Sequence, residues 1–131
     1  LGRIDDLRNF IEPFKKLNIN VSLFVDPLLP QIDACRKTGA NFIEIHTGLY
    51  ASSRNNEERR KHLKGIAEGV ALGRSLGLKI NAGHGLDYYN VKEIVLIDGI
   101  EELNIGFSIV ARSVFVGLEK AVAEMKQAMR S

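Results

Sequence analysis

A histidine lies between two glycines in the stretch INAGHGLD, directly after a run of residues with strand character. Glycines on both sides of His84 cost conformational entropy and supply no packing, so this stretch is either a tight turn or the floor of an active site. Imidazole is the side chain that ordinarily titrates near neutral pH, so it can both donate and accept a proton. His84 is therefore the first candidate for proton transfer.

A carboxylate and a second histidine occur in the stretch NFIEIHT. In a strand, side chains alternate, so Ile43 and Ile45 are predicted to face one way and Phe42, Glu44 and His46 the other. A carboxylate in the middle of an apolar strand is costly unless it is paired or hydrogen-bonded. Glu44 is thus predicted to be functional or to belong to a structural ion pair. His46 is either a ligand contact or a structural hydrogen-bonding group, and both interpretations stay open.

A third candidate site is NIGFS, which leads from a strand into the last helical region. Gly106 would let backbone approach a ligand, Ser108 is predicted to be the N-cap, and a helix N-terminus offers free N–H groups to an anion. In (β/α) barrels, the loops after strands seven and eight commonly hold phosphate in this way. The local pattern is weak by itself, because many strand–glycine–helix turns bind nothing.

Other kinds of catalytic site find less support in the residues. Glu44, His46 and His84 could supply three metal ligands, but no H-E-x-x-H motif or cysteine-rich spacing accompanies them, so no metal site and no cofactor are predicted. The chain has no G-x-S-x-G motif, and Cys35 lies in a helical pattern away from every strand end. A serine or cysteine nucleophile is therefore not expected.

Alternating apolar strands and amphipathic helices must position these candidates. Strands are predicted at residues 19–26, 41–47, 78–82 and 102–107, and helices at residues 29–38, 57–76, 91–97 and 110–129. A further helical pattern begins at Ile4 and runs to Leu17, and Pro13 is expected to kink or end it. Strands rich in Val, Ile and Leu that alternate with helices indicate a parallel sheet covered by helices. A doubly wound sheet and a (β/α) barrel both satisfy this α/β pattern.

Composition narrows the class of protein. The 131 residues are 45% hydrophobic and 26% charged, as in a globular domain. A net charge of +2 without a basic cluster gives no positively charged surface that would bind nucleic acid or an anionic membrane. The charged run EERRKHLK, which contains His62, is predicted to be a solvated helix face. No apolar run reaches the roughly 20 residues of a membrane span. The single Cys35 fits a reducing, cytoplasmic location.

The first residue is leucine, and the sequence already reads there as the middle of an amphipathic helix. We therefore expect the chain to be a piece of a longer protein.

Three long motifs, FIEIHTGLYA, SLGLKINAGHGLDYYNV and ELNIGFSIVARSVFVGLEKAV, resemble the pyridoxine 5'-phosphate synthase family, whose members close the pyridine ring in deoxyxylulose-dependent pyridoxal phosphate biosynthesis. The resemblance runs through essentially the whole chain. It implies a (β/α)8 TIM barrel, usually assembled as a homo-octamer. Residues 1–131 would be the C-terminal half of that single domain and contain about strands five to eight with their helices.

The resemblance also implies a reaction and roles for residues. The family joins 1-deoxy-D-xylulose 5-phosphate to 3-amino-2-oxopropyl phosphate and releases phosphate and water. By motif, His84 matches the proton donor, and Glu44 matches the residue credited with transition-state stabilisation. Gly85, Gly106 and Phe107 match the positions that grip the aminoketone phosphate. Phe107 departs from the family, which usually has histidine there, so a backbone contact would survive and a side-chain contact would not.

The same resemblance implies that the remaining acid–base groups, and most contacts to deoxyxylulose phosphate, belong to earlier strands. The 131 residues by themselves are therefore expected to be inactive. Two alternatives remain at this point: a non-catalytic half-barrel that binds phosphate, and another phosphosugar barrel enzyme that shares only the phosphate site.

Overall fold

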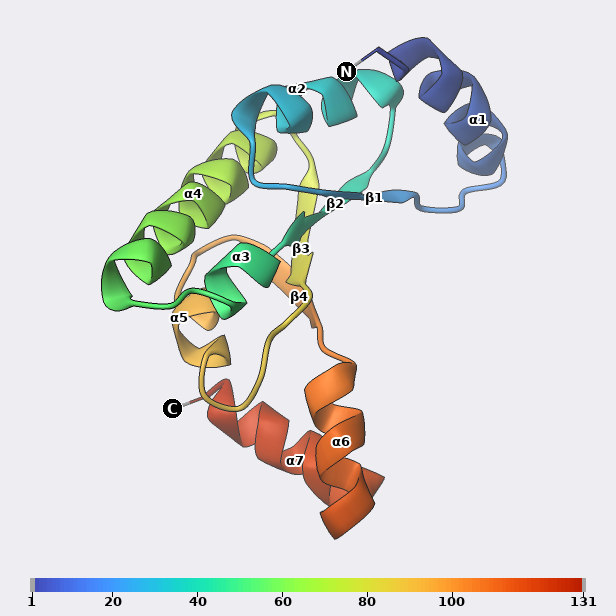
Figure 1. Cartoon of the computed structure of the whole chain (residues 1–131). Coiled ribbons are helices and arrows are strands. Elements are labelled where there is room, and N and C mark those ends of the chain that lie inside the picture. The colour runs from blue at the N-terminus through green and yellow to red at the C-terminus, as the bar shows by residue number, and fades with distance from the viewer. Residues whose placement is uncertain (1, 131) are drawn as a thin grey trace.

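A four-stranded parallel sheet forms the centre of the computed structural model, which describes residues 2–130 (Figure 1). Its strands lie side by side in sequence order: β1 (Ser22–Val25), β2 (Phe42–His46), β3 (Lys79–Gly83) and β4 (Ile100–Asn104). All four predicted strands are confirmed, although β4 starts and ends earlier than residues 102–107. A doubly wound sheet reverses its strand order at a switch point, and this sheet does not within the described residues.

Seven helices connect and follow these strands within residues 2–130. They are α1 (Ile4–Lys16), α2 (Leu29–Thr38), α3 (Gly48–Ala51), α4 (Asn56–Ser75), α5 (Val91–Val95), α6 (Phe107–Val116) and α7 (Leu118–Ala128). The predicted bounds of α2 are confirmed, and those of α4 and α5 are correct to within two residues. The short helix α3 was not predicted.

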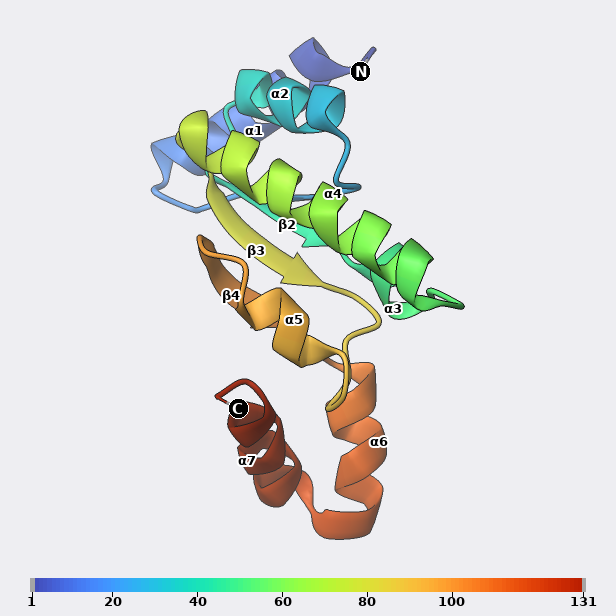
Figure 2. The ribbon, with the colours of Figure 1, turned by 90° about the vertical axis from the view of Figure 1, so that its left-hand side faces the viewer.

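The hydrophobic core lies between the sheet and the helices that cover one face of it. Figure 2 shows α2 and α4 lying over that face. Ile43, Ile45 and Ile80 of the strands pack with Ile66 and Val70 of α4, and all five are fully buried. Burying an aliphatic side chain of this size contributes about 1.5–3 kcal/mol, so these contacts fix the sheet against the helices. The predicted inward and outward alternation of β2 is confirmed.

One predicted helix differs from the structure, and in another a proline does not end the helix. The pattern over residues 110–129 is two helices, because Gly117 between them has φ +83°, a left-handed conformation that glycine adopts most readily. A bidentate ion pair joins the two helices, with Arg112 Nε 2.8 Å from Glu124 Oε2 and Arg112 Nη2 3.2 Å from Glu124 Oε1. Pro13 lies inside α1 without ending it, since the helix continues to Lys16 at the loss of one backbone donor.

The opposite face of the sheet carries a mixture of polar and apolar side chains. Phe24, Glu44 and Asn104 lie on this face, and Phe24 and Asn104 are exposed. None of the helices in the described part of the chain is long and apolar enough to cross a membrane.

Candidate active site

An open hollow of about 750 Å³ lies at the carboxyl ends of the strands. It is lined by Phe24, Glu44, His84, Gly85, Leu86, Asp87, Asn104, Ile105, Gly106, Phe107 and Ser108. The hollow therefore brings together all five residues that the sequence singled out for catalysis or phosphate binding, from β2, from the turn after β3 and from the start of α6. In parallel α/β sheets, ligands bind at this end of the strands.

His84 follows β3 directly and is exposed at the hollow. Its backbone has φ +80°, and the next residue, Gly85, has φ +76°. A residue other than glycine in this region costs on the order of 1–3 kcal/mol and persists only when its surroundings hold it there. Such outliers cluster at active sites, so the backbone of His84 agrees with the functional interpretation of its side chain.

Glu44 lies on the open face of β2, as the alternation predicted, and is half-buried. Its Oε2 accepts a hydrogen bond of 2.6 Å from the Asn104 side-chain amide on β4. Between them lies Gly83, where a Cβ would come within 2.5 Å of Glu44 Oε1 and 2.7 Å of the Asn104 carbonyl oxygen. The carboxylate is therefore held by an amide and by close packing across three strands.

The contribution of Asn104 was not predicted. The sequence offers one signal for it, because Asn104 precedes the same Ile-Gly pair that marked the phosphate turn. Its pairing with Gly83 across β3 and β4 brings it beside Glu44.

His46 packs against His84 with ring centroids 4.8 Å apart in an edge-to-face arrangement. Its Nδ1 lies 3.1 Å from Asp26 Oδ1 just after β1, and its ring also contacts Phe24 at 5.1 Å between centroids. His46 thus makes a hydrogen bond to Asp26 and contacts His84, and it lines a second, neighbouring hollow together with His84 and Gly85. A ligand contact by His46 therefore stays a prediction beside the structural interpretation. Asp26 and Phe24 were missed, although the alternation in VSLFVD places both on the face of Glu44.

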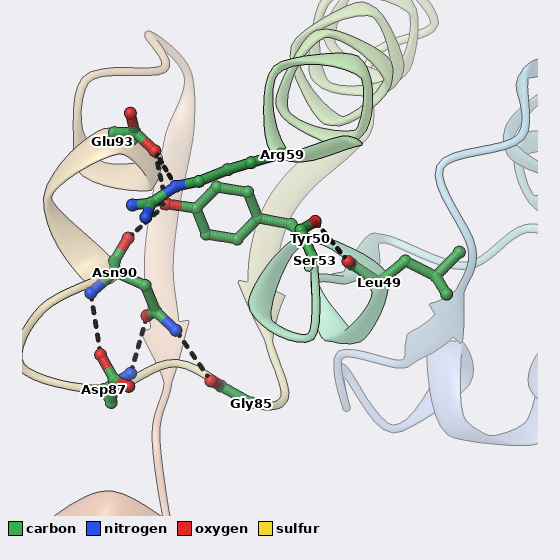
Figure 3. A network of polar contacts seen from close by, with 8 residues as sticks. All are labelled: Leu49, Tyr50, Ser53, Arg59, Gly85, Asp87, Asn90 and Glu93. Atoms are coloured by element: carbon green, nitrogen blue, oxygen red, sulfur yellow. Dashed lines mark hydrogen bonds and ion pairs between the residues drawn. The ribbon is translucent and has the colours of Figure 1, made fainter. Parts of the chain in front are cut away.

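A second polar network lies beside the turn that carries His84 (Figure 3). The Tyr50 hydroxyl lies 2.6 Å from the Asn90 carbonyl oxygen and 2.9 Å from Glu93 Oε2, and it accepts a hydrogen bond of 3.0 Å from Arg59. Arg59 Nε is also 2.6 Å from Glu93 Oε2. Arg59 belongs to the run EERRKHLK, so the prediction of a wholly solvated face is wrong at this residue.

Burial, together with the hydrogen bond to Glu93, raises the pKa of Tyr50 to about 12. Burial opposes ionisation of Glu93, but hydrogen bonds from Tyr50 and Arg59 outweigh it and lower the pKa of that carboxyl. The network therefore consists of a neutral phenol, a carboxylate and a guanidinium at neutral pH.

The start of α6 borders the hollow at Gly106, Phe107 and Ser108. The predicted N-cap role of Ser108 is wrong, because the helix begins earlier, with Gly106 as the N-cap and Phe107 as the first helical residue. The Ser108 hydroxyl instead donates a 2.8 Å hydrogen bond to the Leu86 carbonyl and ties α6 to the turn after β3. Phe107 is 90% exposed, and a Cβ on Gly106 would meet no atom within 4 Å.

Among residues 2–130, no group of three or more histidine, cysteine, aspartate or glutamate side chains is arranged to hold a metal ion.

Comparison with known proteins agrees with the motifs. The family described as "Pyridoxal phosphate biosynthesis protein PdxJ" matches residues 1–131. A relative from Crocosphaera subtropica is 50% identical over 129 residues, which are 98% of this chain and 54% of the relative. A Prochlorococcus marinus relative is 51% identical over 125 residues (95% and 52%), and a Synechocystis relative is 45% identical over 128 residues (98% and 53%).

All three relatives are named pyridoxine 5'-phosphate synthase. The chain spans about half the length of the curated relatives that it matches. Since the family match covers every residue, the chain belongs to the PdxJ family of pyridoxal phosphate biosynthesis proteins.

Proposed function

We propose that the protein forms one half of the active site of a pyridoxine 5'-phosphate synthase, which condenses 1-deoxy-D-xylulose 5-phosphate with 3-amino-2-oxopropyl phosphate. One observation carries the proposal: His84 and Glu44, from neighbouring parallel strands, line the same hollow as the N-terminus of α6. An acid–base pair is thus placed beside a feature suited to binding phosphate.

The fold that we propose for the whole domain is a (β/α)8 TIM barrel, with residues 1–131 as its C-terminal half. The sequential parallel order of β1 to β4 supports this, because barrel strands also follow one another in order. The open face of the sheet supports it too. Phe24 is 56% exposed on that face, and the buried Asn81 Oδ1 has no hydrogen-bond partner in the part of the chain that the structure describes. An opposite barrel wall would cover the first and could supply a donor to the second.

In this proposal His84 is the proton donor. Imine formation, loss of water, elimination of phosphate and ring closure each require that a proton be delivered or removed, and such transfer typically contributes about 10²–10⁴-fold in rate. The exposed imidazole at the rim of the hollow can reach a bound substrate. Glu44, with its orientation fixed by Asn104, would stabilise positive charge that develops on the reacting amine or imine.

Backbone N–H groups at the start of α6, with Gly106 and Phe107, are proposed to bind the phosphate of the aminoketone together with Gly85. An anion is stabilised at a helix N-terminus by free donors and by the helix dipole. Phe107 offers only its backbone to that anion, since its side chain has no hydrogen-bonding atom.

Assembly and location follow the family resemblance and the composition. We propose a homo-octamer of the complete barrel in the cytoplasm, with Cys35 kept as a free thiol, since it is buried and these residues contain no second cysteine.

The test uses a hybrid protein in which this chain replaces the segment that it matches in the Crocosphaera subtropica relative. The hybrid protein is incubated with both substrates, and pyridoxine 5'-phosphate is measured by mass spectrometry. We expect product from the hybrid protein and none from its His84→Asn variant. A folded hybrid protein that makes no product, while the relative itself does, would refute the proposal.

The isolated chain is expected to make no product, because one sheet of four strands leaves the site open to water and lacks the opposite wall. Product at about a hundredth of the hybrid rate would show that the site is complete within these residues. A second candidate function, phosphate binding without catalysis, is favoured only by Phe107. It predicts that the hybrid protein binds phosphate and forms no product.

A further inference from the structure

The turn that carries His84 has three consecutive backbone carbonyls, and each accepts a hydrogen bond from a side chain elsewhere in the chain. The carbonyls of Gly83 and His84 are bound by Thr47, and the carbonyl of Gly85 is bound by Asn90. This turn contains the two positive φ angles of His84 and Gly85. Because a strained backbone persists only when its surroundings hold it, these two side chains are candidates for what holds it.

Thr47 follows β2 directly, at the position after His46, and is 0% exposed. Its hydroxyl lies 2.7 Å from the Gly83 carbonyl oxygen and 2.6 Å from that of His84, so one proton is shared between two acceptors. Its backbone N–H also donates to the Gly83 carbonyl at 2.8 Å. Thr47 therefore fastens the end of β2 to the point where β3 becomes the turn.

Asn90 holds the other side of the turn and is 9% exposed (Figure 3). Its Nδ2 donates to the Gly85 carbonyl at 3.1 Å, and its Oδ1 accepts from the Asp87 N–H at 2.8 Å. The carbonyl of Asn90 accepts from the Tyr50 hydroxyl at 2.6 Å, and that hydroxyl is held in turn by Arg59 and Glu93. The position of Asn90 is thus fixed by a charged network behind the turn.

We propose that Thr47 and Asn90 are positioning residues, which hold the backbone of His84 in its left-handed conformation and so aim its imidazole at the hollow. Neither residue lines the hollow, so both act through His84. The inference rests on the proposed function for its effect on rate. Its structural part, the conformation of His84, is independent of that function.

The chain supplies a matched control in Thr38. This threonine is 2% exposed, and its hydroxyl donates a 2.7 Å hydrogen bond to the Cys35 carbonyl. It lies at the end of α2 and outside the hollow. Thr38→Val and Thr47→Val therefore each remove one buried hydroxyl bonded to backbone carbonyl oxygen, and only the second loosens the turn.

The experiment compares Thr47→Val, Thr47→Ser, Asn90→Ala and Thr38→Val in the hybrid protein. We expect Thr47→Val and Asn90→Ala to lower kcat about tenfold or more with KM changed less than about threefold, since a misplaced proton donor weakens the transition state more than substrate binding. Thr47→Ser keeps the hydroxyl and is expected to restore kcat to within about threefold, and Thr38→Val is expected to leave it unchanged.

Crystal structures of the same variants separate this inference from the proposed function. The Thr47→Val structure is expected to show His84 outside the left-handed region, and the Thr38→Val structure to show it at φ near +80°. His84 unchanged in Thr47→Val would overturn the inference whether or not the hybrid protein makes product. If the parent hybrid protein makes product, equal kcat in Thr47→Val and Thr38→Val would overturn it as well. If no hybrid protein makes product, the proposed function is refuted. If the Thr47→Val crystal structure still shows His84 displaced, the positioning role is supported in that case too.

Discussion

Replacing Gly83 by alanine is the most direct test of the packing around Glu44. Gly83 is a strand residue of β3 without a positive φ, so its backbone suits alanine and any cost comes from contacts. The added Cβ would lie 2.5 Å from Glu44 Oε1, 2.7 Å from the Asn104 carbonyl oxygen and 3.1 Å from Asn104 Cβ. The carboxylate can rotate away, but the backbone oxygen on β4 cannot move without shifting the strand.

Overpacking of this kind costs about 1–3 kcal/mol. A matched substitution, Gly65→Ala inside α4, adds a Cβ that meets no atom within 4 Å. It should stabilise the protein by about 0.5–1 kcal/mol, because alanine favours a helix interior over glycine. At about 2–4 °C per kcal/mol for a domain of 150–250 residues, Gly83→Ala should lower the Tm by about 2–12 °C and Gly65→Ala should raise it by about 1–4 °C.

The assay is thermal unfolding of the two hybrid variants by circular dichroism, followed by the rate of product formation well below both Tm values. Gly83→Ala is expected to lose activity even where it is fully folded, because Glu44 is displaced from Asn104. Gly65→Ala should keep the full rate. A Gly83→Ala variant as stable and as active as the parent would refute the argument that Gly83 sets the position of the carboxylate.

Three further predictions concern single side chains. His84→Asn should lower kcat of the hybrid protein by about 10²–10⁴-fold without a change in Tm, and a rate within about threefold of the parent would exclude the proton-donor role. Phe107→His adds a donor at the start of α6 and should tighten inorganic phosphate binding about tenfold in calorimetry, which corresponds to about 1.4 kcal/mol. An unchanged Kd would show that this side chain does not reach the anion. Because the pKa of Tyr50 is raised to about 12, its contribution to stability is present below pH 10 and is lost as the pH rises towards 12. Ultraviolet titrations of the hybrid protein and of its Tyr50→Phe variant should therefore show the same tyrosine ionisation near pH 10. A transition near pH 10 that the variant lacks would contradict the network.

The strands were predictable because their signal is local. In NFIEIHT, two isoleucines alternate with polar residues, and this pattern alone places Glu44 on the open face. The bounds of α2 were equally clear, since a proline lies in its first turn and Gly39 follows its last residue with φ +86°. Where the local signals conflicted, prediction failed. Gly117 lies in a strongly apolar helical run, and nothing in the pattern said that it would break the helix rather than continue it.

The start of α6 shows a subtler failure. Serine is a common N-cap, so Ser108 was the natural choice from sequence. In the structure the helix begins at Phe107, and the Ser108 hydroxyl bonds the Leu86 carbonyl, 22 residues earlier. The Ser108 hydroxyl thus donates to a distant carbonyl instead of accepting from an N–H group of the following helical turn. The consequence for function is favourable, because N–H groups at the helix start have no side-chain cap and stay available to an anion.

Thr47 illustrates the same limit behind the turn that carries His84. A threonine at the end of a strand is ordinary in sequence, and the glycines around His84 drew attention to that turn instead. The acceptors of the Thr47 hydroxyl lie 36 and 37 residues further along the chain, so their meeting depends on the parallel pairing of β2 with β3. Sequence can point to His84 as the proposed proton donor by its chemistry. The register of β2 against β3 decides which side chain meets the turn that carries His84. A shift of one residue would turn Thr47 to the other face and leave the carbonyls of Gly83 and His84 without this donor.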